Sequence, residues 1–106
     1  MFTPLLETLA EQGNGIHAYR AASQMSWQKA AEIPDHAAAF YLLATTIDAF
    51  VDRHERMPLM FAEVKQSFAT LKQEIEALSA AYAAGDPAQI LEALNKIAAT
   101  RAAELD

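Results

Sequence analysis

The chain has 106 residues, no cysteine, 53% hydrophobic residues and a formal net charge of −6, a composition typical of one compact globular domain. The lack of cysteine excludes a disulfide scaffold, a thiolate zinc site and a cysteine nucleophile. Alanine supplies 24 residues while valine, isoleucine and threonine together supply 14, so helix formers dominate and strand formers are scarce. We therefore predict an all-α fold in a single helical-bundle domain over 1–106.

Charge and hydropathy also limit the expected partners and location. The longest stretch without a charged residue or histidine runs from 37 to 47, far shorter than the roughly 20 apolar residues of a membrane span. Acidic and basic residues are interspersed along the chain, without the basic cluster that nucleic-acid binding requires. The sequence therefore predicts a cytoplasmic protein that binds neither membrane nor nucleic acid, and nothing in it indicates a cofactor.

The first predicted helix covers 4–32 and is kinked at Gly13 and Gly15. Thr3 and Pro4 mark its start, because threonine caps helices and proline is tolerated at the first helical position. Glycine normally interrupts a helix. The spacing of three and four residues between apolar positions nevertheless continues through both glycines. The pattern therefore favours one kinked helix, or two helices that share an axis.

Two further helices are predicted over 36–56 and 59–84. A series of mostly apolar positions crosses both of them in alternating steps of three and four residues, which is the spacing of a heptad seam. This pattern is typical of the core of a bundle. The positions are Phe40, Leu43, Ile47, Phe50, His54, Met57, Phe61, Val64, Phe68, Leu71, Ile75, Leu78 and Tyr82.

Pro58, in the middle of this seam, allows two architectures. In the first, the chain reverses at the proline and the protein is an antiparallel up-down bundle of four main helices. In the second, one proline-kinked helix spans 36–84 and forms a dimer, because a single copy cannot cover so long an apolar seam. We favour the reversal, and a homodimer is compatible with both architectures.

The last predicted helix covers 87–105. Glycine commonly ends a helix, aspartate caps the next one and proline suits its first position, and the chain carries these residues as Gly85, Asp86 and Pro87. We expect this helix to pack through an apolar stripe that consists of Ile90, Leu91, Leu94, Ile97, Ala98 and Leu105.

Asp48, Asp52 and Glu55 are the candidate metal ligands. Their i, i+4, i+7 spacing places three carboxylates on one stripe of the helix 36–56, with Tyr41 above them. The stripe lies off the heptad seam, so we expect it to face solvent, where it could hold a divalent cation weakly or attract a partner protein. No Glu-x-x-His motif, Ser-His-Asp arrangement or glycine-rich phosphate loop is evident, so no catalytic residue is predicted.

Two apolar clusters add to the candidate partner surface. Trp27 and Met25 lie on a helix that is otherwise less apolar than its neighbours, and Met57 and Met60 flank the proline at 58. Tryptophan and methionine are enriched at the centres of interfaces. The first functional hypothesis is therefore a non-catalytic protein–protein interaction module, such as an adaptor, chaperone, immunity protein or regulatory subunit. The alternative is a bundle, with or without enzymatic activity, that binds a metal through Asp48, Asp52, Glu55 and His54 or a small apolar ligand. The apolar ligand would occupy a cavity lined by Phe40, Phe50, Phe61 and Phe68.

Overall fold

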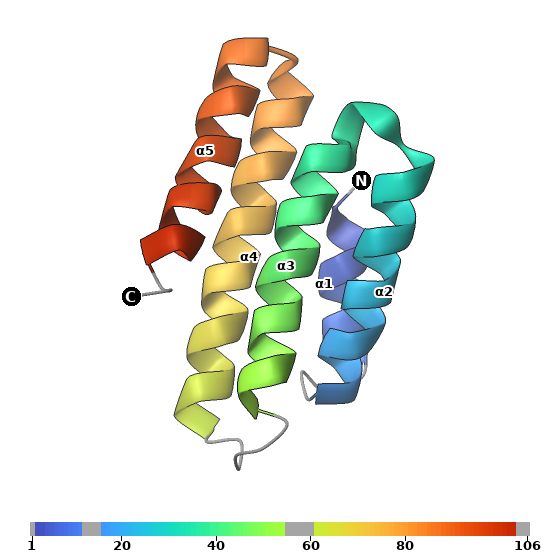
Figure 1. The fold of residues 1–106 in the computed structure, drawn as a ribbon, viewed down its shortest axis with the longest axis vertical. Helices are drawn as coiled ribbons and strands as arrows, with labels where there is room; N and C mark the ends of the chain where they lie inside the picture. Colours follow the sequence, from blue (N-terminus) through green and yellow to red (C-terminus); the bar gives the residue numbers. More distant parts are fainter. Residues whose placement is uncertain (1, 12–15, 55–60, 104–106) are drawn as a thin grey trace.

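The computed structural model describes residues 2–11, 16–54 and 61–103, and these residues form helices without any strand (Figure 1). The prediction of an all-α fold is therefore confirmed. The helices are α1 (Thr3–Glu11), α2 (Ile16–Glu32), α3 (Ala37–His54), α4 (Phe61–Ala84) and α5 (Pro87–Ala103), with a short 3-10 turn, Pro34–His36, before α3. None of these helices combines the length and the apolar character that crossing a membrane requires.

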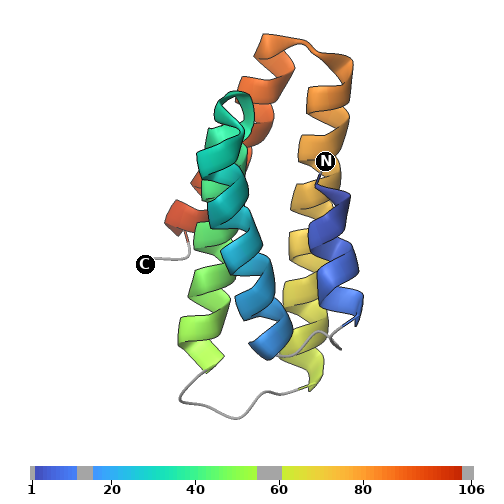
Figure 2. The same cartoon turned by 90° about the vertical axis from the view of Figure 1, so that its right-hand side faces the viewer.

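α1 and α2 are separate helices that run in opposite directions, so the structure corrects the prediction of one kinked helix over 4–32. The ring of Phe2, just before α1, lies 4.8 Å from that of Phe40 near the start of α3. Tyr19, near the start of α2, stacks instead on Phe50 near the end of α3, at 3.9 Å. α1 and α2 therefore start toward opposite ends of the bundle (Figure 2). The glycines between them lie outside the described residues.

α3 and α4 also lie antiparallel, which corrects the alternative of a single helix over 36–84. At one end of the pair, His54 Nδ1 is 3.7 Å from Glu63 Oε2. At the other end, the rings of His36 and Tyr82 stack at 4.3 Å. Both contacts require the chain to reverse between the two helices. The reversal falls within 55–60, so the role of the proline there lies outside the described residues.

The core lies where α1, α2, α3 and α4 meet. α2 and α3 approach closely because α2 presents the small side chains of Ala18, Ala22 and Ser26, all completely buried. The Ser26 hydroxyl donates a hydrogen bond to the carbonyl of Ala22, 2.9 Å away, which satisfies it inside the core. The heptad prediction is confirmed for most of its described positions, because the following are buried: Phe40, Leu43, Ile47, Phe50, His54, Leu71, Ile75 and Leu78. The other described seam positions, Val64, Phe68 and Tyr82, are half-buried and pack against the core.

The turn between α4 and α5 forms as predicted. Gly85 adopts a φ of 71°, and its amide donates to the carbonyls of Ala81 at 3.3 Å and Tyr82 at 3.2 Å. Asp86 then caps α5, since its Oδ1 accepts a hydrogen bond of 3.0 Å from the amide of Ala88. This sequence of a left-handed glycine and an aspartate cap sets α5 antiparallel to α4.

Replacing Gly85 by alanine is expected to lower the free energy of unfolding by about 1–2 kcal/mol, because an L residue is strained at positive φ. The loss would come from backbone strain and not from a steric clash, since a Cβ at this position would meet no atom within 4 Å. Urea unfolding of the variant measures it. Gly85→Asn is the matched control and should lose less, because asparagine tolerates this conformation better. Equal stability of the alanine variant and the parent protein would contradict the left-handed turn.

α5 is the least buried helix, and part of its predicted packing is wrong. Ile97 is buried, but Leu91 is 59% exposed. α5 lies at the edge of the bundle and packs mainly against α4 and α3, so it buries a narrower stripe than the sequence pattern indicated (Figure 1). An ion pair connects the C-terminal end of α5 to α4, because Arg101 Nη2 lies 2.6 Å from Glu74 Oε1.

Candidate functional site

An exposed aromatic pair bridges α2 and α3. Trp27 on α2 is 41% exposed and Tyr41 on α3 is 53% exposed. Their ring centroids are 5.4 Å apart at an interplanar angle of 83°, an edge-to-face arrangement that favours aromatic pairing. In the described part of the chain only one other large hydrophobic side chain, Leu91, is comparably exposed. Exposed aromatic surface is therefore concentrated at this place on the bundle.

Asp48 on α3 holds the tryptophan in position. Its Oδ2 accepts a hydrogen bond of 3.0 Å from the indole Nε1 of Trp27, and its Oδ1 accepts one from the hydroxyl of Ser23. Both bonds run from α2 to α3 and both end on a charged acceptor, which makes them stronger than neutral hydrogen bonds. The indole is thus fixed by its nitrogen while much of its ring remains open to solvent.

We call Trp27, Tyr41, Asp48 and Asp52 the aromatic–acidic face. Asp52 belongs to it because it follows Asp48 by one helical turn and is exposed. Tyr41 precedes Asp48 by two turns on the same stripe of α3. The face therefore presents two aromatic rings beside two carboxylates, on two helices that are packed tightly together.

The structure unites two groups of residues that the sequence suggested separately. Trp27 came from an apolar cluster and Asp48 from an acidic stripe, and they are hydrogen-bonded. Met25 is half-buried and packs against the core, so it contributes to the interior more than to the face. Ser23 was not predicted, and its hydroxyl is the second anchor of the carboxylate. The remaining predicted residues lie outside the described part of the chain: Glu55, Met57 and Met60.

The metal hypothesis finds no additional support in the described residues. Within 2–11, 16–54 and 61–103 no group of three histidine, aspartate or glutamate side chains is placed to hold an ion. Both carboxylate oxygens of Asp48 accept hydrogen bonds from α2. The proposed ligand trio also includes Glu55, which is not described, so a metal bound by Asp48, Asp52 and Glu55 stays a prediction.

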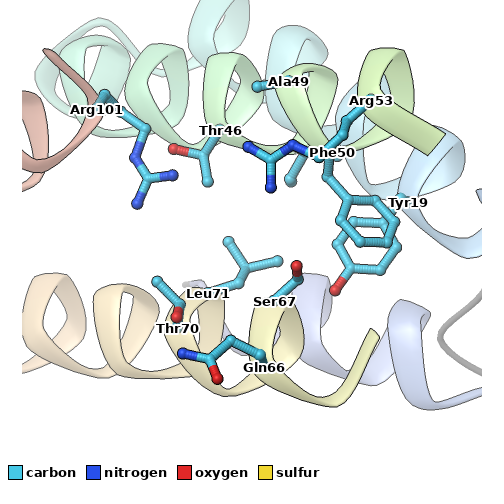
Figure 3. A pocket seen from close by; sticks show the side chains of 11 residues that line it. Tyr19, Thr46, Ala49, Phe50, Arg53, Gln66, Ser67, Thr70, Leu71 and Arg101 are labelled. Atoms are coloured by element: carbon cyan, nitrogen blue, oxygen red, sulfur yellow. The ribbon is translucent and has the colours of Figure 1, made fainter. Parts of the chain in front are cut away.

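A polar cavity of about 170 Å³ lies on another part of the bundle, between α3 and α4 (Figure 3). Of the phenylalanines expected to line an apolar cavity whose side chains are described (Phe40, Phe50 and Phe68), only Phe50 contributes to it. Two arginines and several hydroxyl groups dominate its walls instead. The lining residues are Tyr19, Thr46, Ile47, Ala49, Phe50, Arg53, Gln66, Ser67, Thr70, Leu71 and Arg101.

Burial changes the pKa of one group that lines this cavity, the phenol of Tyr19. Tyr19 is 1% exposed, and burial raises its pKa to about 12. The phenol therefore stays protonated at every physiological pH. Its hydroxyl oxygen is buried and has no hydrogen-bond partner in the described part of the chain.

Comparisons with known proteins gave no match, whether with family models, curated proteins or solved structures. The function must therefore be argued from geometry. The fold and its surface define a helical bundle with a rigid aromatic–acidic face and a separate polar cavity.

Proposed function

We propose that this chain is a non-catalytic protein-interaction module that binds a basic segment of another protein through the aromatic–acidic face. The observation that carries this proposal is the Trp27 side chain, which is held by Asp48 and yet 41% exposed. Tryptophan and tyrosine are the residue types that contribute most binding free energy at protein interfaces. A ring that is already fixed loses little conformational entropy when a partner covers it.

Charge specifies the chemistry of the partner. Asp48 holds the indole of Trp27, Asp52 lies exposed one turn farther along α3, and the whole chain carries a net charge of −6. A segment rich in lysine or arginine would be attracted over a distance and could place its cations on the open aromatic rings. The same negative charge opposes binding to nucleic acid. A cytoplasmic location remains part of the proposal, because the chain has no cysteine and so needs no oxidising compartment for disulfides.

A photo-crosslinker placed at the face tests the proposal directly. Tyr41→p-benzoylphenylalanine is compared with the same substitution at Leu91, which is similarly exposed but lies on α5. In the cells that make this protein, we expect position 41 alone to capture another protein, at a segment rich in basic residues. Equal capture at both positions would contradict the proposal. Capture of a second copy of this chain at position 41 would contradict binding of a basic partner and show instead that the face is a homodimer interface.

The captured segment, made as a peptide, allows a quantitative prediction. Trp27 is the only tryptophan, so its fluorescence reports binding at the face without a label. Tyr41→Ala is expected to weaken binding about tenfold, which corresponds to about 1.4 kcal/mol. Asp52→Asn should weaken binding severalfold, mainly by slowing association. The association rate of this variant should also depend less on salt concentration. Leu91→Ala is the matched control and should change nothing; a loss equal to that of Tyr41→Ala would place the interface elsewhere.

A further inference from the structure

The cavity between α3 and α4 is lined by basic side chains although the chain as a whole is acidic. Arg53 and Arg101 line it, and among the residues that the structure describes no aspartate or glutamate does. In Figure 3 both guanidinium groups extend from their helices toward the same space. An acidic protein with a positively lined cavity concentrates anions at that one place.

The two arginines are held differently. Arg101 reaches across from α5 and is anchored by its 2.6 Å ion pair with Glu74, which lies outside the cavity lining. Arg53 is exposed on the last turns of α3 and has no ion-pair partner in the described residues. One guanidinium is therefore fixed at the cavity and the other is available at its mouth. Planar guanidinium groups match carboxylate and phosphate oxygens in geometry as well as charge.

The opposite part of the cavity supplies neutral hydrogen-bond donors. Ser67, Thr70 and Gln66 line it from α4 (Figure 3). Thr46 lines the cavity from α3, but its hydroxyl already donates to the carbonyl of Leu42 at 2.9 Å. The most informative donor is Tyr19, whose side chain is almost completely buried and whose hydroxyl points to the end of the cavity beside Ser67. This hydroxyl has no hydrogen-bond partner in the described part of the chain. Buried polar groups are nearly always paired, so an unpaired one facing a cavity indicates a ligand contact.

We propose that this cavity binds a small organic oxyanion, a carboxylate or a phosphate ester, between Arg53, Arg101 and the hydroxyl of Tyr19. The volume of about 170 Å³ is below the roughly 300–1,000 Å³ of drug-sized sites, so the cavity suits a small metabolite. Ile47, Phe50 and Leu71 add an apolar wall, so the ligand carries a short hydrocarbon part beside its anionic group. This site is independent of the aromatic–acidic face.

Titration with three anions, followed by amide NMR of the whole chain, tests the site and separates the two sources of oxyanion. Inorganic phosphate, succinate and benzoate are added separately at constant ionic strength. We expect at least one to give saturable shifts confined to amides around the cavity, such as those of Thr46, Ser67 and Thr70. Saturation by phosphate alone identifies a phosphate ligand, and saturation by succinate or benzoate identifies a carboxylate. Shifts with none of the three, or shifts spread over the surface, would overturn the proposal.

Matched variants connect the binding to named groups. Arg53→Gln is expected to weaken the anion that saturates by about tenfold, whereas Lys65→Gln, an exposed lysine of α4 outside the lining, should not affect it. Tyr19→Phe keeps the ring and removes only the unpaired hydroxyl, so we expect a severalfold weaker affinity in a fully folded protein. Tyr41→Phe is its control at an exposed tyrosine. Equal losses from Arg53→Gln and Lys65→Gln would show that the effect is only net charge, which would overturn the site.

Discussion

Replacing Phe40 by alanine is expected to lower the free energy of unfolding by about 3–5 kcal/mol. Phe40 is 1% exposed and lies on the buried side of α3, where its ring is 4.8 Å from that of Phe2. Removing the ring loses the free energy gained by transferring it from water to the core. It also leaves a cavity that the tightly packed helices α2 and α3 cannot fill. Urea unfolding at neutral pH, followed by circular dichroism, measures the loss.

Phe68→Ala is the matched control for this prediction. Phe68 belongs to the same heptad seam and packs against the core, but it is only half-buried. The same truncation should therefore cost about 1–2 kcal/mol there, because less apolar surface leaves water on folding. Equal losses at the two positions, or a loss below about 1 kcal/mol at Phe40, would contradict the assignment of this part of α3 to the core.

The heptad pattern predicted which side chains of each helix are buried. Apolar residues spaced three and four apart lie on one face of a helix, and that face packs against the core. Leu43, Ile47, Leu71 and Ile75 were identified in this way and all are buried. The same pattern contains no information about the direction of a helix. The spacing of three and four residues between apolar positions in α1 continues into α2, although the two helices run in opposite directions. A short antiparallel pair and a kinked helix thus give the same spacing.

Side-chain contacts between different helices could not be predicted from the sequence. Trp27 and Asp48 were each recognised as candidates, yet their hydrogen bond depends on the rotation and axial offset of α2 against α3. The polar cavity was missed for the same reason, since Tyr19, Arg53 and Arg101 come from three helices and no spacing links them. The one available signal was chemical: an aromatic hydroxyl on a predicted core stripe requires a partner.

Tyr19 should make the protein sensitive to alkaline pH. Its pKa is about 12 in the folded chain, whereas the ordinary tyrosine pKa of 10.0 applies to the unfolded chain. Between these values the unfolded chain releases the phenol proton while the folded chain retains it, so deprotonation favours unfolding. The contribution of the neutral phenol is fully present below pH 10 and disappears as the pH rises through 12. A shift of this size corresponds to a loss of about 3 kcal/mol.

Urea unfolding of the parent protein and of Tyr19→Phe, measured in parallel from about pH 8 to about pH 12, isolates this contribution. The two proteins differ only by the Tyr19 hydroxyl, so the difference between their two curves reports the contribution of Tyr19. Burial also raises the pKa of Tyr82, which leaves a smaller alkaline loss in the variant. We expect the parent protein to lose stability more steeply above pH 10. At the lowest pH of the series the variant should be at least as stable, because it removes a buried hydroxyl that has no hydrogen-bond partner among the described residues. Parallel curves would show that the phenol is accessible to water, and a large loss at that lowest pH would show that it is hydrogen-bonded in the folded protein.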